Sequence, residues 1–93
     1  MRKTQVDIDA IEILRRSAES TPGTLSTYLA LREIATACDS AEFYTNVEEI
    51  RSRSLTSERW CRMNLNLLQR KRLIDKSKSA MGLKIRLLKV AKA

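Results

Sequence analysis

The chain contains no histidine, and it has only two cysteines, two glycines, one proline and four aromatic residues. Without histidine it lacks the usual general base and the commonest metal ligand. No apolar run approaches the roughly 20 residues of a membrane-spanning helix. The charged N-terminal stretch is not that of a signal peptide. We therefore expect one helix-rich, intracellular domain over residues 1–93, since so few glycines and prolines predict few loops.

The two cysteines, Cys38 and Cys61, are too far apart in sequence to form a Cys-x-x-Cys site. Each lies in a helical apolar pattern, which predicts two small buried residues and leaves open whether they form a disulfide. Carboxylates such as Glu58 and Asp75 stand alone, and there is no glycine-rich phosphate loop or nucleophile motif. The sequence therefore predicts no catalytic residue, no metal site and no cofactor, and it argues against an enzyme.

Basic residues are abundant and unevenly placed. The chain has 18 Lys and Arg against 11 Asp and Glu, a net charge of +7. Residues 1–45 carry five basic and seven acidic side chains, whereas residues 46–93 carry thirteen basic and four acidic ones, a net charge of +9. An asymmetry of this size favours a surface for a polyanion over a generally basic exterior.

Two helices are predicted in the first half. Residues 4–20 have Thr4 as N-cap and an apolar stripe broader than one helix face. That stripe packs either on its own domain alone or also on a partner subunit. After the break at 20–23, where Thr21 and Pro22 suit an N-cap and first helical position, a second helix is expected over 24–38. Its predicted core residues are Leu25, Tyr28, Leu29, Leu31, Ile34, Ala35 and Cys38.

The middle of the chain predicts a short extended segment over 42–45 and two helices. Asn46 is an N-cap candidate for a helix over 47–53, and Thr56 or Ser57 caps a longer helix over 57–72. On a helical wheel, Trp60, Cys61, Leu65, Leu67 and Leu68 fall on one side, so we expect Trp60 in the core. Asn64 falls in the same apolar arc and needs a buried partner. The opposite side carries Arg59, Arg62, Asn66, Gln69 and Arg70.

The last segment changes to a period of two, which is typical of strands. Residues 73–76 predict one strand, 77–82 a turn with Gly82 at positive φ, and 83–87 a second strand with alternating apolar and basic residues. We expect a β-hairpin whose outer face and tip carry Lys76, Lys78, Lys84 and Arg86.

This order of elements resembles a winged helix-turn-helix domain over residues 24–90. The part that carries the resemblance runs from Asn46 to Ile74: a capped short helix, a turn, and an amphipathic helix that leads into a basic hairpin. PadR- and MarR-type regulators and the terminal domains of archaeal origin-recognition initiators are similar there. The fold class expected is mainly α with a small β-hairpin wing and an extra N-terminal helix. The resemblance implies double-stranded DNA as partner.

In such a domain the helix over 57–72 would enter the major groove, where arginine can pair with guanine and asparagine with adenine. We expect base contacts from Ser57, Arg59, Arg62 and Asn66. Other basic or hydroxyl side chains would contact phosphates. These are Thr56, Arg53, Arg70, Lys76, Lys78, Ser79 and Lys84.

The extra N-terminal helix implies a homodimer on a palindromic site, since related domains use such a helix for a two-fold contact. Ile8, Ile11 and Leu14 are the candidates for dimerisation.

Length and layout are also similar to those of winged-helix partition adaptors of archaeal plasmids. These adaptors bind a centromere-like site and recruit a ParB-type protein for DNA segregation. The alternative within DNA binding is a small transcriptional repressor of the PadR or MarR type. Either role places the protein in the cytoplasm, associated with DNA. A protein-interaction winged helix would need an apolar recognition face, and an RNA binder would need exposed aromatic residues.

Overall fold

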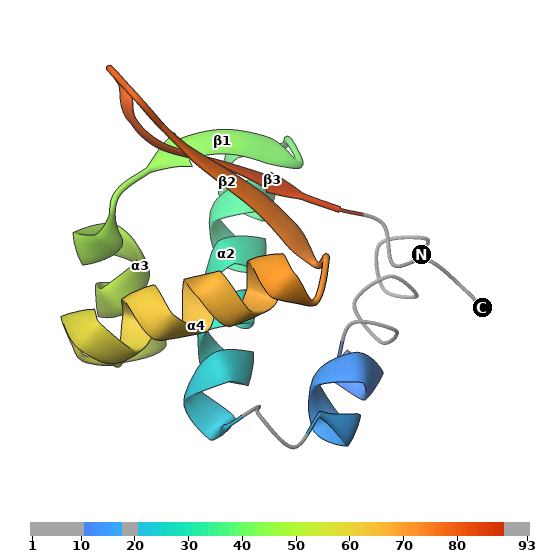
Figure 1. Cartoon of the computed structure of the whole chain (residues 1–93). Coiled ribbons are helices and arrows are strands. Elements are labelled where there is room, and N and C mark those ends of the chain that lie inside the picture. The colour runs from blue at the N-terminus through green and yellow to red at the C-terminus, as the bar shows by residue number, and fades with distance from the viewer. Residues whose placement is uncertain (1–10, 18–20, 89–93) are drawn as a thin grey trace.

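The computed structural model describes residues 11–17 and 21–88, and its helices precede most of a small sheet (Figure 1). Residues 11–16 are helical. The elements that follow are α2 (Pro22–Cys38), β1 (Glu42–Thr45), α3 (Val47–Ser54), α4 (Glu58–Arg70), β2 (Ile74–Ser79) and β3 (Gly82–Leu87). This order is that of a winged helix-turn-helix fold, as predicted: α3 and α4 form the helix-turn-helix and the β2–β3 hairpin is the wing.

Helix α2 begins as the sequence predicts. Thr21 is the N-cap, Pro22 takes the first turn, and Thr21 and Thr24 form a reciprocal capping box. The helix ends at Cys38 and is capped by Asp39, whose φ of 53° lies in the left-handed region. Two core predictions for this helix are wrong, because Leu29 and Cys38 are exposed.

Thr24 and Thr27 are buried in α2 instead, and both are fully shielded from solvent. Their hydroxyls have hydrogen-bond partners inside the domain, so the core-facing side of α2 is partly polar. The spacing of apolar residues in the sequence did not predict that Thr24 and Thr27 are buried, because it assigned only apolar side chains to the core.

Both helices of the helix-turn-helix start at capping side chains. The Oδ1 atom of Asn46 accepts a hydrogen bond from the Glu49 amide at 2.7 Å, and the Oγ atom of Ser57 accepts one from the Trp60 amide at 3.3 Å. Between them Leu55 ends α3 with a φ of 57°, in the left-handed region. Ser57, and not Thr56, is therefore the cap of α4.

The sheet has the order β1-β3-β2 and is antiparallel throughout. Ser79 pairs with Gly82, so the connection between β2 and β3 is only Ala80 and Met81. The expected turn over 77–82 was too long, because β2 continues to Ser79. Gly82 has a φ of 114°, the positive value that the sequence predicts.

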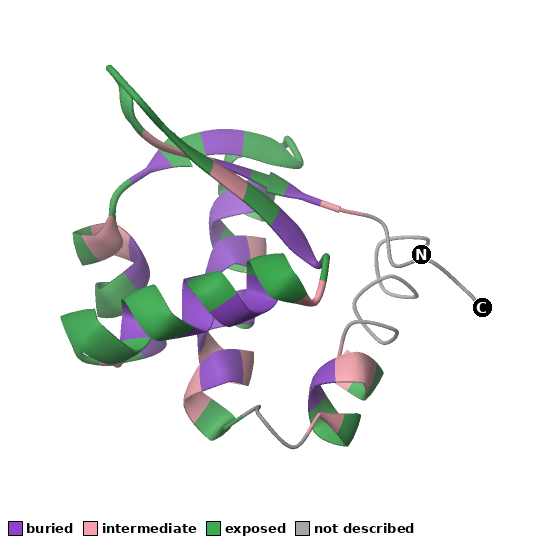
Figure 2. Cartoon of the chain, viewed as in Figure 1, coloured by how far each residue is buried: buried purple, intermediate pink, exposed green. Residues whose placement is uncertain are grey.

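The core lies where α2, α3, α4 and one face of the sheet meet (Figure 2). Leu31, Ile50, Leu68 and Ile85 are fully buried at its centre. Leu14, from the helical segment over 11–16, is buried in the same cluster. The predicted helix over 4–20 is described only in part: Thr4 and Ile8 lie outside the described residues, and Ser17 is not helical.

In the described part of the chain, no helix combines the length and the apolar character that crossing a membrane requires.

Candidate nucleic-acid interface

Helix α4 has two chemically distinct faces. Cys61, Leu65 and Leu68 are buried in the core, whereas Arg59, Arg62 and Asn66 are exposed. Gln69 and Arg70 continue the exposed face toward the end of the helix. The sequence-based separation of the two faces is confirmed for all of these residues. As a result, α4 exposes a polar and cationic surface that no other part of the described domain covers.

Asn64 fixes the rotation of α4 against α2. The residue is 4% exposed. Its Oδ1 atom accepts a hydrogen bond from the Thr24 hydroxyl at 3.0 Å, and its Nδ2 atom donates one to the Thr27 hydroxyl at 3.3 Å. Thr27 in turn donates to the Gly23 carbonyl oxygen at 2.8 Å. The two threonines are the buried partners that Asn64 needs on the apolar side of α4. Because they hold α4 in one rotation about its axis, they determine which of its side chains are exposed.

Trp60 is not a core residue, contrary to the sequence-based expectation. Its side chain is 52% exposed, and Met63, one turn further on, is 46% exposed. On a helical wheel Trp60 falls between the buried Leu67 and Asn64, but it belongs to the first turn of α4. A wheel gives the direction of a side chain around the helix and not how far along the helix its neighbours reach, so it predicted burial for Trp60.

The first turn of α4 carries opposite charges side by side. The Nη2 atom of Arg62 lies 3.1 Å from the Oε2 atom of Glu58, one turn earlier. Among the residues that the structure describes, Arg59 has no ion-pair partner. Arg59 is therefore an arginine of this face whose charge no described carboxylate offsets at ion-pair distance.

Hydroxyl groups line the turn before α4. The Thr56 and Ser54 hydroxyls lie 2.8 Å apart, and Ser57 Oγ accepts from the Trp60 amide. Accepting that bond leaves the Ser57 hydroxyl hydrogen available for a further acceptor. Ser57 is exposed and Thr56 is half-buried, so the two differ in how readily an external group can reach them.

The arginines of α3 are largely neutralised by carboxylates. Arg53 Nη1 lies 3.1 Å from Glu33 Oε1, and Arg53 Nη2 lies 3.9 Å from Glu49 Oε2. Arg51 donates to both carboxylate oxygens of Glu48 at 2.7 Å. That hydrogen bond lowers the pKa of Glu48 and raises the pKa of Arg51. Arg53, a predicted phosphate contact, would have to exchange these partners for a phosphate.

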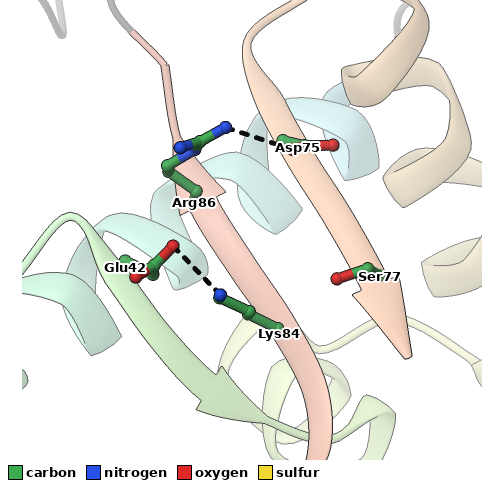
Figure 3. A pocket seen from close by; sticks show the side chains of 5 residues that line it. All are labelled: Glu42, Asp75, Ser77, Lys84 and Arg86. Carbon is green, nitrogen blue, oxygen red and sulfur yellow. Dashed lines mark hydrogen bonds and ion pairs between the residues drawn. The ribbon is translucent and has the colours of Figure 1, made fainter. Parts of the chain in front are cut away.

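The basic residues of the hairpin lie on two different faces of the sheet. Lys76 is paired with Ile85 and Lys78 with Leu83, so both share the face that packs against the helices. Lys84 lies on the opposite face, where its Nζ atom is 3.4 Å from Glu42 Oε2 (Figure 3). Arg86 lies on that face too, 3.4 Å from Asp75 Oδ2. The single basic outer face expected from the sequence is thus wrong.

The remaining predicted site residues belong to other parts of the chain. Ser79 is the last residue of β2, and its hydroxyl accepts from the Met81 amide and donates to the Gly82 carbonyl oxygen. Of the predicted dimerisation residues, Leu14 is 2% exposed within its own domain, and Ile11 keeps part of its surface open. Ile8 lies outside the described residues.

The two cysteines differ in environment. Cys61 is fully buried in α4, as predicted, and burial raises the pKa of its thiol. Cys38 is exposed at the end of α2, and both are free thiols. The described residues contain no cluster of Cys, Asp and Glu that could hold a metal ion.

Two hollows in the described part of the chain are small. One, of about 110 Å³, lies among Glu42, Asp75, Ser77, Lys84 and Arg86, and one of about 210 Å³ lies between the 11–16 segment and α2. Both fall below the roughly 300–1,000 Å³ of typical small-molecule sites. The candidate site is the exposed face of α4, which carries Arg59, Arg62 and Asn66.

Comparison of the chain with protein-family models, curated proteins and solved structures finds no match, so the assignment of this surface rests on its own residues and geometry.

Proposed function

We propose that the protein binds double-stranded DNA sequence-specifically, with α4 inserted in the major groove. The observation that carries the proposal is the exposed face of α4, where Arg59, Arg62 and Asn66 project on the side opposite the core. A major groove about 12 Å wide admits one α-helix, and these side chains have the donors that guanine and adenine edges accept. Helix α3 would lie across the phosphate backbone.

Phosphate contacts would come from residues around α4. Ser57 and Thr56 precede the helix N-terminus, where backbone amides and the helix dipole favour an anion. Lys76 and Lys78 share the sheet face that packs against the helices, and neither has an ion-pair partner among the described residues. Arg53 and Arg70 on the helices, and Ser79 at the tip of the hairpin, complete this set. Lys84 is omitted, because it lies away from the tip, on the outer sheet face, with its Nζ atom 3.4 Å from Glu42 Oε2.

A homodimer on a palindromic site is part of the proposal. The N-terminal segment is the candidate contact, and Ile11 is the described one of the predicted dimerisation residues that retains open apolar surface. Two copies would then present their α4 helices one DNA turn apart, roughly 34 Å. For the biological role we propose a plasmid-partition adaptor in the cytoplasm, which would bind a centromere-like site and recruit a ParB-type protein.

The site itself is tested by two arginine substitutions with the same change in charge. We expect Arg59→Ala to weaken binding to the preferred duplex by about 1–2 kcal/mol, roughly tenfold, through loss of a base contact. Arg86→Ala, on the outer sheet face, is the matched control and should change the affinity little. Fluorescence anisotropy at one fixed, physiological salt concentration measures both. Equal losses in the two variants would contradict a binding surface on α4.

The biological role is tested by a DNase footprint on DNA flanking the protein's own gene, with rising protein concentration. A partition adaptor is expected to protect one palindrome first and then adjacent DNA. A fixed window over a promoter would instead indicate a repressor. No protection at any site would contradict the partition role, and RNA or protein partners would then have to be tried.

A further inference from the structure

Met63 is an apolar side chain at one edge of the polar and cationic face of α4, between Arg70 and the buried Leu67 on a helical wheel. It is 46% exposed on α4, while the core side of that helix is formed by Cys61, Leu65 and Leu68. At 100° per residue, Met63 lies about 40° from Arg59 and about 60° from Asn66 around the helix. It therefore projects beside Arg59 and Asn66, two of the residues proposed to contact bases.

We infer that Met63 reads the C5-methyl group of a thymine, an inference that rests on the proposed DNA-binding function. In the major groove the edges of A, G and C offer hydrogen-bonding groups, and thymine alone adds a methyl group. An unbranched thioether side chain is flexible and polarisable, so it can pack closely against that methyl. The charges of the surrounding face favour a nucleic acid over an apolar protein surface as the occupant.

The position of the thymine follows from the helix geometry. Arg59 and Asn66 are separated by about 10 Å along the axis of α4. Met63 lies between them along the helix. The thymine should therefore lie between the base pairs that Arg59 and Asn66 contact. Trp60 is less suited to this role, because it lies about 100° from Arg59 around the helix, between the buried Leu67 and Asn64.

The experiment removes the methyl group from the DNA. The wild-type protein first selects its preferred duplex from a random pool, and each thymine of a half-site is then replaced by deoxyuracil. We expect one position where this replacement weakens wild-type binding about fourfold, the effect of losing one buried methyl group. Met63→Gln should be insensitive at that position, and Met63→Leu, which keeps an apolar side chain, should remain sensitive. Helix propensity is similar for all three residues, so the melting temperature should be preserved.

Each outcome separates this inference from the proposed function. If the wild type selects a duplex but no deoxyuracil replacement weakens it, or if Met63→Gln stays as sensitive as the wild type, Met63 does not read the methyl group. DNA binding by α4 would stand in both cases. If the wild type selects no duplex at all, the proposed function fails and the role of Met63 fails with it.

Discussion

Replacing Asn64 with alanine is expected to lower the free energy of unfolding by about 3 kcal/mol, although the side chain is polar. Its amide is the acceptor for Thr24 and the donor for Thr27, and both threonines are 0% exposed. Truncation leaves a buried donor and a buried acceptor without their partners, and water cannot readily replace them. In a domain of this size the melting temperature should fall by about 12–24 °C.

Asn66 provides a matched control two residues further along α4. It is the same residue type in the same helix but is exposed on the opposite face. We expect Asn66→Ala to leave the melting temperature almost unchanged and to weaken sequence-specific DNA binding. Thermal unfolding followed by circular dichroism, together with anisotropy on the preferred duplex, measures both effects. A stable Asn64→Ala variant would mean that the threonine contacts do not hold α4 in place.

Gly82→Ala is the second substitution with a large expected effect, a loss of about 3 kcal/mol in folding stability. Gly82 has a φ of 114°, which residues with a Cβ atom rarely adopt. An added Cβ would also lie 2.9 Å from the carbonyl oxygen of Thr45, a backbone atom of β1 that cannot move aside easily. The substitution should therefore disturb the hairpin and its pairing with β1 together.

The chain's other glycine gives the control. At Gly23, in the first turn of α2, an added Cβ would meet its nearest atom, Asn64 Nδ2, at 3.5 Å, an ordinary contact. Gly23→Ala should be neutral or stabilising by up to about 1 kcal/mol, because alanine restricts the unfolded chain. Urea unfolding of the two variants compares them directly. If both shifted the midpoint by the same amount, backbone conformation at Gly82 would not be the cause.

Local signals predicted the elements well. The strand over 42–45 and the caps Thr21 and Asn46 all agree with the structure, because a capping side chain or a prolyl ring acts on its own few residues. The exposed arginine and asparagine face of α4 was also predicted, since it lies farthest from the apolar arc. These features depend little on what the rest of the chain does.

Features that depend on distant contacts were not predicted. The exposure of Trp60 and the burial of Thr24 both depend on how α2 and α4 pack around Asn64. The face of Lys76 and Lys78 depends on strand register, because successive residues of a strand point to opposite faces. The sequence-based turn began at residue 77, inside the actual β2, so Lys78 was assigned to a turn. Lys76 ended a predicted strand in which two successive apolar residues, Leu73 and Ile74, gave no clear alternation.

The place of β3 in the middle of the sheet affects how the protein can form during its synthesis. Phe43 in β1 has its partner, Ile85, in the last strand of the described chain, and β2 pairs with β3 as well. Neither outer strand can pair until β3 has been translated. The nascent chain can build α2, α3 and α4 from local contacts while β1 and β2 still lack partners. Formation of the wing should therefore be the late, non-local step of folding.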